Sequence, residues 1–315
     1  MLARTNGNWA NTFIAGVPKG GTTALAAILA QHPEVFVPRK KEPRYYYFKD
    51  EEISPSNKVN RNVITKAEHY AALYAGASEK VLVDASPSYY GSEKALSLIR
   101  QDVPGARLIL LLRDPVERTF SHFWFAVQRG YEPPGSKFED IFTTGEVDAG
   151  GGYVRRRNYL KSSVYVERLD ALFKIFPRGQ VYMTTSERFM FEQATVLSEI
   201  CEFLEIGRYD FDLGVGEKAK SGLPKSRLVH ALTRNAQRVM KLAPGLIPRH
   251  VREGVDRAHN SNLVKPQMLP GTRRRLVDYY RDSVSELARK HQVDVSHWRN
   301  FSGATREFQF NDDRV

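Results

Sequence analysis

The sequence predicts an α/β protein with a doubly wound, mostly parallel sheet that is flanked by helices. Short apolar runs alternate along the chain with longer stretches whose apolar residues recur at helical spacing. A glycine-rich turn at residues 16–23 joins the first apolar run to the first helical stretch, as in P-loop proteins. We therefore expect a P-loop-type fold, a single domain over residues 1–315, and a ligand crevice at the carboxyl ends of the strands.

The periodicity places each element in turn. Strands are expected at 12–15, 81–84, 108–112 and 181–184, where the runs are short and apolar. Helices are expected at 22–31, 67–74, 93–100, 115–128, 161–176, 186–204 and 270–291, where the apolar residues are amphipathically spaced. Two segments rich in glycine, proline and basic residues are expected to be irregular, namely a flap over about 130–152 and a lid over about 215–265 that orders around a ligand.

Composition excludes several classes of protein. No apolar run approaches the ~20 residues that a membrane span needs, and the N-terminus lacks the apolar stretch of a secretory signal, so we expect a cytoplasmic protein. The single cysteine, Cys201, excludes an internal disulfide and lies in an amphipathic pattern typical of a buried residue. The net charge of +11 favours an anionic partner, which leaves nucleic acid, nucleotides and acidic glycans open.

The turn Gly16-Val17-Pro18-Lys19-Gly20-Gly21-Thr22-Thr23 has the composition of a phosphate-binding loop. Its glycines let the backbone approach an anion closely, and the N–H groups of the following helix point at that anion. The spacing G-x-x-x-x-G is that of a nucleoside-triphosphate loop, but Thr22 stands where such loops carry lysine, and the lysine is three residues earlier, at Lys19. The loop is therefore expected to hold a phosphate group whose terminal chemistry differs from that of Mg-ATP.

A second informative block follows the strand expected at 108–112. Asp114 is suited to be the N-cap of the next helix, with Pro115 at its first position and Glu117 as the second member of a capping box. Arg113 at the end of the strand and Ser121, about two turns into the helix, are placed to hold one phosphate together.

With these two motifs the chain resembles the PAPS-dependent sulfotransferases, which use 3′-phosphoadenosine 5′-phosphosulfate. Residues Pro18–Thr23 match the 5′-phosphosulfate loop of that family, and the block from Arg113 to Ser121, with Arg118, matches its 3′-phosphate motif. The likeness is to the glycosaminoglycan 3-O- and N-sulfotransferases and related bacterial enzymes, and it covers most of residues 12–300 in order. Further matching segments are Glu42–Tyr46, Asp84–Tyr90, Ser163–Tyr165 and Phe176-Pro177.

The resemblance implies a role for each site residue in sulfuryl transfer from PAPS, with PAP as product and no metal. The nucleotide-binding set that it implies is Lys19, Gly20, Gly21, Thr22, Thr23, Arg113, Ser121 and, at the end of the lid, Lys265. Lys19 is expected to neutralise charge on the leaving phosphate, and Glu42 to act as general base toward the acceptor. A salt bridge from Glu42 to Lys40, Lys41 or Arg44 is the structural alternative.

Other residues remain candidates for the base and for the acceptor site. His32 and His122 are alternative bases, the first beside a helix end and the second expected to point away from the ligand. The aromatic runs Tyr45–Phe48, Tyr89-Tyr90 and Phe123–Phe125 are either an acceptor pocket or core.

The chain also departs from the glycosaminoglycan enzymes. It has Ala85 where those enzymes carry a lysine before Thr-Pro, and it lacks their disulfide and their membrane anchor. These departures favour a cytosolic bacterial relative.

The acceptor stays open among a glycan or glycolipid hydroxyl, an amine, a small-molecule, polyketide or carrier-bound hydroxyl, and a phenol. Arg155–Arg157 either bind an acidic acceptor or face water. The rival interpretations are a P-loop kinase or nucleotide phosphotransferase, and a basic nucleic-acid-binding module. The missing loop lysine and the absence of an RNA-binding or zinc-finger pattern argue against them.

Overall fold

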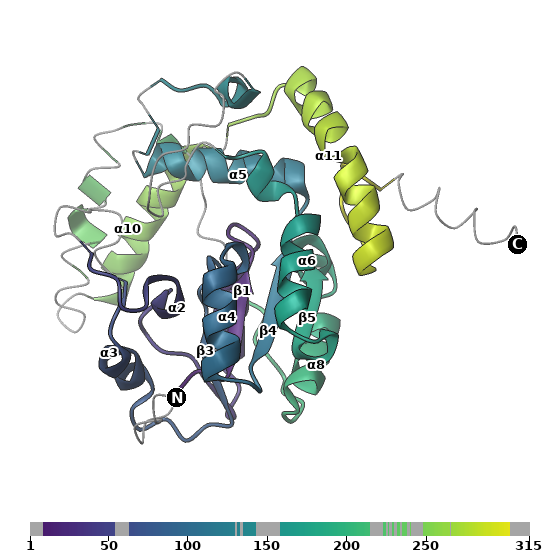
Figure 1. Cartoon of the computed structure of the whole chain (residues 1–315). Coiled ribbons are helices and arrows are strands. Elements are labelled where there is room, and N and C mark those ends of the chain that lie inside the picture. Colours follow the sequence, from purple (N-terminus) through teal and green to yellow (C-terminus); the bar gives the residue numbers. More distant parts are fainter. Residues whose placement is uncertain are drawn as a thin grey trace, which may run out of the picture.

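The fold is centred on one parallel sheet, seen in a computed structural model of the chain (Figure 1). The described residues are 9–53, 63–129, 131–132, 135–142, 158–214, 223–224, 226, 229, 232–233, 235–237, 240, 248–264 and 266–302. The five strands are β1 (Thr12–Gly16), β2 (Val35–Phe36), β3 (Val81–Asp84), β4 (Arg107–Leu112) and β5 (Val181–Thr185). Their order is β2-β3-β1-β4-β5, and every neighbouring pair is parallel. The predicted sheet is therefore confirmed, and β2 is an added edge strand of two residues.

Helices connect the strands. The α-helices that the structure describes are α1 (Thr22–Leu29), α2 (Tyr45–Phe48), α3 (Ala67–Ala71), α4 (Glu93–Asp102), α5 (Pro115–Gln128), α6 (Val166–Ile175), α7 (Ser186–Phe191), α8 (Gln193–Leu204), α10 (Arg249–Ser261) and α11 (Pro270–His291). Short 3-10 turns occur at Ala72–Tyr74, Tyr89–Gly91, Phe138–Phe142, Lys161–Ser163 and Arg178–Gln180. None of the helices in the described residues is both long and apolar enough to cross a membrane.

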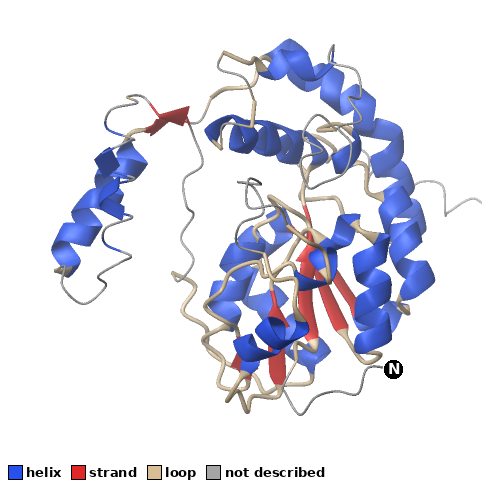
Figure 2. Ribbon diagram, turned by 60° about the vertical axis from the view of Figure 1, so that its left-hand side comes forward, coloured by secondary structure: helices blue, strands red, loops and turns tan. Residues whose placement is uncertain are grey.

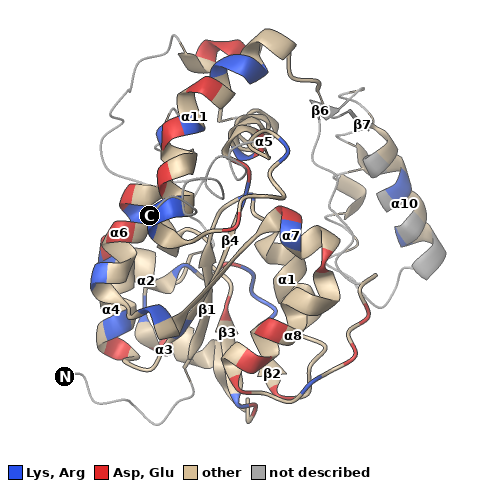
Figure 3. Cartoon of the chain, turned by 90° about the vertical axis from the view of Figure 1, so that its right-hand side faces the viewer, with Lys and Arg blue, Asp and Glu red and all other residues tan. Residues whose placement is uncertain are grey.

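Alternate residues of each central strand pack into different cores, one on each face of the sheet. Phe13 of β1 belongs to the core that α4, α6 and α11 cover, whereas its neighbour Ile14 belongs to the core under α1 and α8. Figure 3 shows these two helical layers on opposite sides of the strands. Because successive side chains of a strand point to opposite faces, a sheet buried on both faces needs apolar residues throughout, as in Leu108–Leu112.

The helices expected over 22–31 and 67–74 end earlier as α-helices, at Leu29 and Ala71, and three further elements differ more from the prediction. The helix expected over 186–204 is two helices, separated at Glu192, whose φ of −120° and ψ of 44° are not helical. The helix expected over 161–176 starts as a 3-10 turn and becomes α-helical at Val166. The lid expected to be irregular over 215–265 contains α10 and an antiparallel pair of β6 (Leu223–Pro224) with β7 (Leu263–Val264), and Figure 2 shows this part apart from the parallel sheet.

The carboxyl ends of β1, β3, β4 and β5 meet at one edge of the sheet, and the helix α5 starts there directly after β4 (Figure 1). The helix α11 packs on α5 and α6, and its Tyr280 hydroxyl lies 2.7 Å from Thr119 Oγ1 on α5. This edge therefore carries the glycine-rich loop, the segment after β3 and the Arg113 block close to one another.

Candidate functional site

In the loop between β1 and α1, three carbonyl groups accept hydrogen bonds from other parts of the protein, and a fourth accepts one from within the loop. Each carbonyl oxygen of residues 17–20 accepts a hydrogen bond. In chain order, the donors are Gly20 N–H at 2.9 Å, Arg118 Nε at 3.1 Å, Arg113 Nη1 at 2.8 Å and Ser186 Oγ at 2.7 Å. With four successive carbonyls fixed in this way, the amides that follow are left to face the other side, which is the arrangement of an anion-binding concavity.

Two glycines are required by this geometry. A Cβ on Gly20 would lie 2.3 Å from the Leu111 carbonyl oxygen, so no side chain fits between the loop and β4. Gly21 is the N-cap of α1 with a φ of +88°, a conformation that side chains disfavour.

The amides available to an anion are those at the start of α1. The first N–H groups of any helix have no intrahelical acceptor, and Gly21 has no side chain to cap them. They include Thr22 and Thr23, the first of which has a buried side chain and the second an exposed one. The Gly20 N–H, also expected to face the phosphate, donates instead to Val17 O in this structure.

The Lys19 side chain extends from the loop into a group of cations. Its Nζ lies 4.5 Å from the centre of the Phe125 ring, and the Arg129 guanidinium lies 5.1 Å from the same ring. Burial, followed by repulsion from Arg113, Lys41 and Arg129, lowers the pKa of Lys19 to about 8, while Glu42 opposes that shift. A site in which cations repel one another in this way is suited to a ligand with several negative charges.

The arginines of the second block have different tasks. Arg118 is buried and donates from Nη1 to Ser163 Oγ (2.8 Å), besides holding Pro18 O, so it supports the loop from behind. Arg113 is only half-buried and reaches the loop at Lys19 O. Ser121 is half-buried two turns into α5, as its sequence position predicted.

The start of α5 is partly as expected. The Asp114 side chain caps the helix by accepting from the N–H groups of Val116 and Glu117. The predicted capping box, in which Glu117 would accept from the Asp114 N–H, is wrong. Asp114 N–H donates instead to Glu187 Oε1 (3.2 Å), and Glu117 pairs with Arg273 (2.7 Å).

Glu42 lies at the mouth of the site beside the start of α1. It lines one pocket together with Thr22 and Thr23; the remaining lining residues are Ala26, Val37, Pro38, Lys40, Lys41 and Ala85. Its Oε2 is 2.6 Å from Arg44 Nη2, so the salt bridge weighed from the sequence is present with Arg44. Glu42 and Arg44 both have positive φ, 49° and 55°, which marks a tight turn at this point.

Neither histidine is suited to be the base. His32 is buried, with Nε2 2.9 Å from Gly207 O and Nδ1 accepting from Glu34 N–H, so both ring nitrogens are occupied. Burial, with Arg118 and Lys19 nearby, lowers the pKa of His122 to about 3. An imidazole of that pKa is a weak acceptor for a hydroxyl proton.

Most of the aromatic residues considered for the acceptor belong to the core. Tyr45, Tyr46, Phe48, Tyr89, Tyr90 and Phe123 are each at most 2% exposed. Tyr47, Trp124 and Phe125 are half-buried, and Phe125 faces Lys19. Cys201 is buried as predicted. Lys265, Arg155–Arg157 and most of the flap lie outside the described residues.

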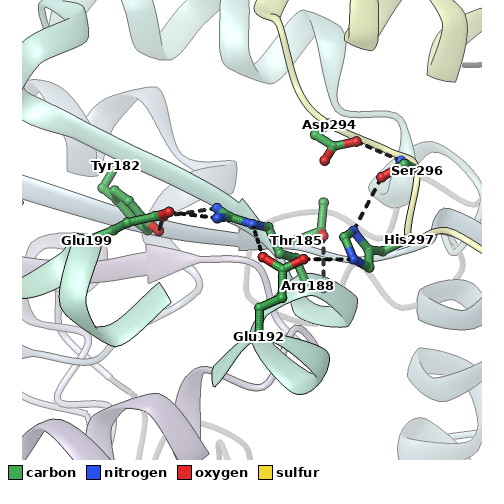
Figure 4. Close-up of polar contacts among 8 residues, drawn as sticks. All are labelled: Tyr182, Thr185, Arg188, Glu192, Glu199, Asp294, Ser296 and His297. Atoms are coloured by element: carbon green, nitrogen blue, oxygen red, sulfur yellow. Dashed lines mark hydrogen bonds and ion pairs between the residues drawn. The ribbon is translucent and has the colours of Figure 1, made fainter. Parts of the chain in front are cut away.

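Some residues of the site had not been singled out from the sequence as binding residues. Ser186 directly follows β5, and its hydroxyl fastens the loop; only its position at a strand's carboxyl end could have indicated this. Arg129 and Lys41 act on Lys19 from separate segments; Lys41 belongs to the basic run 39–41, and Arg129 is a lone arginine after α5 with no motif around it. The helix α7, which carries Ser186, is held by the polar network around Arg188 that Figure 4 shows.

Comparison with known proteins gives a consistent result. A family model described as "Sulfotransferase family" matches residues 11–210. The chain is 25% identical over 200 residues to bifunctional heparan sulfate N-deacetylase/N-sulfotransferase 4 of Mus musculus, covering 62% of this chain and 22% of that protein. It is 26% identical over 197 residues to heparan sulfate glucosamine 3-O-sulfotransferase 3A1 of the same species, covering 62% of this chain and 46% of that protein. The chain thus spans less than half the length of either relative.

A solved structure shares the fold. The crystal structure of a sulfotransferase from Alicyclobacillus acidocaldarius matches with a TM-score of 0.68 at 20% identity, covering 93% of this chain and 99% of that one.

Proposed function

This chain belongs to the sulfotransferase family, and we propose that it transfers the sulfuryl group of PAPS to a hydroxyl or amine of an acceptor. The observation that carries the proposal is the loop whose four carbonyls are fixed inward beside Lys19, with the start of α1 facing the same pocket as Glu42. An anion-binding loop and a carboxylate at one pocket are what a transfer from a phosphate to a nucleophile requires.

The donor would be held by this chain's cations and amides. The amides of Thr22 and Thr23 would bind the 5′-phosphate, and Arg113 with Ser121 would bind the 3′-phosphate. Lys19 would neutralise the charge that builds on the phosphate oxygen as its bond to sulfur breaks. Because the reaction needs mainly alignment and charge neutralisation, a rigid loop is an advantage.

Glu42 would take the proton of the acceptor as the new bond to sulfur forms. Arg44 engages Oε2, and among the described residues no hydrogen bond to Oε1 is found, so Oε1 is the oxygen for this task. The acceptor atom, the sulfur and the leaving phosphate oxygen would then lie in line between Glu42 and Lys19.

The acceptor that we propose is a hydroxyl or amine on a glycan, a glycolipid or a small or carrier-bound molecule. Two relatives are named for heparan sulfate glucosamine or N-sulfation, which supports a glycan. The pocket at Glu42 combines the cations Lys40 and Lys41 with Ala85, where the resemblance leads one to expect a lysine.

Nucleotide calorimetry in EDTA tests the donor. We expect PAP to bind without divalent metal, since Lys19, Arg113 and the amides supply the positive charge. Binding of ATP with Mg²⁺ but not of PAP would favour a P-loop kinase instead. Saturable oligonucleotide binding that PAP does not displace would favour a nucleic-acid-binding module.

Transfer from ³⁵S-labelled PAPS tests the reaction and the acceptor class. A panel of N-deacetylated heparosan, galactosylceramide, a long-chain alcohol, 4-nitrophenol and a hydroxyacyl group bound to a carrier protein covers the proposed acceptors. We expect label transfer to at least one member in EDTA. Tight PAP binding with no transfer to any member of the panel would contradict the proposed acceptor classes.

A further inference from the structure

Asp84 is a buried carboxyl at the end of β3 whose hydrogen-bond partners lead toward the segment of the candidate base. It is fully buried and accepts three hydrogen bonds, from Ser86 Oγ (2.6 Å), Tyr89 OH (2.8 Å) and Tyr70 OH (2.9 Å). A buried carboxyl with three hydroxyl donors is held in one orientation.

Two of these hydroxyls also accept hydrogen bonds from backbone amides of the segment that carries Glu42. Arg44 N–H donates to Ser86 Oγ at 3.0 Å, and Tyr46 N–H donates to Tyr89 OH at 3.3 Å. A hydroxyl has a single proton, and in both cases Asp84 receives it. The oxygen of each hydroxyl is therefore fixed as an acceptor for the backbone.

The segment that these bonds hold is not one that the chain adopts by itself. Glu42 and Arg44 have left-handed φ values of 49° and 55°, which persist in residues other than glycine only where the surroundings impose them. Arg44 in turn pairs with Glu42 Oε2 at 2.6 Å. The two chains of hydrogen bonds from Asp84 thus end on the amide of Arg44, whose side chain orients the Glu42 carboxylate, and on the amide of Tyr46, two residues further on.

We propose that Asp84 is a positioning residue, which fixes the position of the Glu42 carboxylate through two routes. Each route is a chain of hydrogen bonds, one through the Ser86 hydroxyl and one through the Tyr89 hydroxyl. The inference rests on the proposed role of Glu42 as general base. Burial raises the pKa of Asp84 to about 6, and its three hydroxyl donors oppose that shift. At pH 7.5 the carboxyl is therefore mainly ionised and accepts all three hydrogen bonds.

The chain offers a matched control in Tyr70. Its hydroxyl, on α3, donates to the same Asp84 oxygen, Oδ2, as that of Tyr89, and is part of neither route to Glu42 (Figure 1 shows α2 and α3 on the β3 side of the sheet). The ring of Tyr70 stacks on Tyr45 at 4.4 Å, a contact that phenylalanine keeps. Ser86→Ala and Tyr70→Phe therefore each remove one hydrogen bond to Asp84, but only Ser86→Ala frees the Arg44 amide.

Steady-state kinetics at pH 7.5 with ³⁵S-labelled PAPS and the best acceptor of the panel test the proposal. A misplaced base costs turnover rather than donor binding, so Ser86→Ala should lower kcat about ten- to a hundredfold while KM for PAPS changes by less than about twofold. Tyr70→Phe should keep kcat within about twofold of the wild type at a comparable loss of melting temperature. Tyr89→Phe should resemble Ser86→Ala. Equal losses of kcat in Ser86→Ala and Tyr70→Phe would overturn the positioning role.

A double variant separates this inference from the proposed function. If Ser86 acts through Glu42, adding Ser86→Ala to Glu42→Gln should cause no further loss of kcat. If the double variant instead shows the full additional loss of kcat seen for Ser86→Ala alone, Ser86 does not act through Glu42. If Glu42→Gln itself retains wild-type kcat, the base assignment fails, whatever Ser86→Ala does.

Discussion

Lys19 is the ionisable residue of the glycine-rich loop, and its surroundings disfavour its charge. Its pKa is lowered to about 8 by burial and by three neighbouring cations, so the free site holds a partly deprotonated amine in weakly alkaline solution. A bound phosphate or sulfate would favour the ammonium form and raise this pKa. Anion binding should therefore be accompanied by proton uptake above pH 8.

The affinity for PAP should consequently be constant below about pH 8 and fall as pH rises above it, by up to about tenfold per pH unit, because the amine must then be protonated on binding. Calorimetric titrations between pH 6.5 and 9.5 measure this. Lys19→Arg keeps the charge at every pH and should flatten the profile. The same fall in Lys19→Arg would assign the pH dependence to another group.

Arg113 and Ser121 are expected to recognise the 3′-phosphate. Arg113→Ala should weaken PAP binding by about 1.5–3 kcal/mol, and Ser121→Ala by about 1 kcal/mol, the range for hydrogen bonds to charged groups and for ordinary ones. Since Arg113 also holds Lys19 O, part of its effect comes from the loop. AMP, which lacks the 3′-phosphate, separates the two effects: Ser121→Ala should weaken PAP but leave AMP unchanged, and an equal loss for both would contradict the assignment.

Glu42→Gln should lower kcat by about 10²–10⁴ and leave PAP affinity nearly intact, because the amide cannot accept the acceptor proton. Arg44→Gln is the comparison variant: it breaks the same ion pair but keeps the carboxylate, so it should lower kcat less than Glu42→Gln does, through misplacement of the base alone. A purely structural salt bridge predicts equal losses of melting temperature in both variants and near wild-type turnover per folded molecule in both.

At the level of elements, the close approach of the loop to β4 decides whether the anion site exists. Gly20→Ala places a methyl group 2.3 Å from a carbonyl oxygen, so the loop must move off the sheet. We expect a loss of about 1–3 kcal/mol in the free energy of unfolding, as for overpacked cores, together with the loss of PAP binding. Gly105→Ala, in the turn before β4 with open space around it, should be nearly neutral in both measurements. Intact PAP binding in folded Gly20→Ala would show that the loop position is not needed.

Elements whose signals are local could be predicted from the sequence. The start of α5 is an example, because Asp114 and Pro115 act on amides within three residues. The partner of Asp114 N–H could not be predicted, since Glu187 reaches it from α7, 73 residues away. Likewise the helical pattern over 186–204 runs through Glu192, where the structure separates two helices and where the Glu192 side chain pairs with Arg188 and with the distant His297.

In the candidate site, too, features that depend on neighbouring residues could be predicted, whereas contacts between distant segments could not. The glycine-rich loop and the block from Arg113 to Ser121 could be proposed from the sequence because each motif is continuous there. The contributions of Ser186, Asp84 and Arg129 arise where separate strands and helices end at one edge, and no spacing within the chain encodes that. The sequence placed His32 beside a helix end and gave no partner for it, because the group that occupies its Nε2, the Gly207 carbonyl, is 175 residues away.

At the scale of the whole molecule, the network around Arg188 joins β5, α7, α8 and the segment 294–297 (Figure 4). Arg188 contacts both carboxylate oxygens of Glu199, at 2.6 and 2.9 Å, and Glu192 at 3.0 Å, while Glu192 also meets His297 at 3.2 Å. The Arg188 side chain is 24% exposed, so the contribution of these ion pairs to stability is expected to lie between that of a surface pair and that of a buried pair.

Arg188→Met should therefore lower the free energy of unfolding by about 1–3 kcal/mol at pH 7, more than an exposed pair and less than a buried one. Arg188 lowers the pKa of Glu199, so this contribution is present above the unfolded pKa of glutamate and is lost as pH falls through the lower folded value. Urea unfolding at pH 7 and pH 3 measures both, and the difference between wild type and variant should shrink at pH 3. A difference independent of pH would point to packing.

The fixed carbonyls of the glycine-rich loop also determine when binding competence arises during folding. Their side-chain donors lie 94, 100 and 166 residues further along the chain, at Arg113, Arg118 and Ser186. Contacts of such long sequence separation form only after the intervening chain has been closed into place. A nascent chain that has emerged as far as α5 already contains both phosphate motifs, yet it lacks the hydroxyl that fastens Gly20. Nucleotide capture should thus be among the last properties that the newly made protein gains, and a ligand present during synthesis would select chains whose sheet is complete to β5.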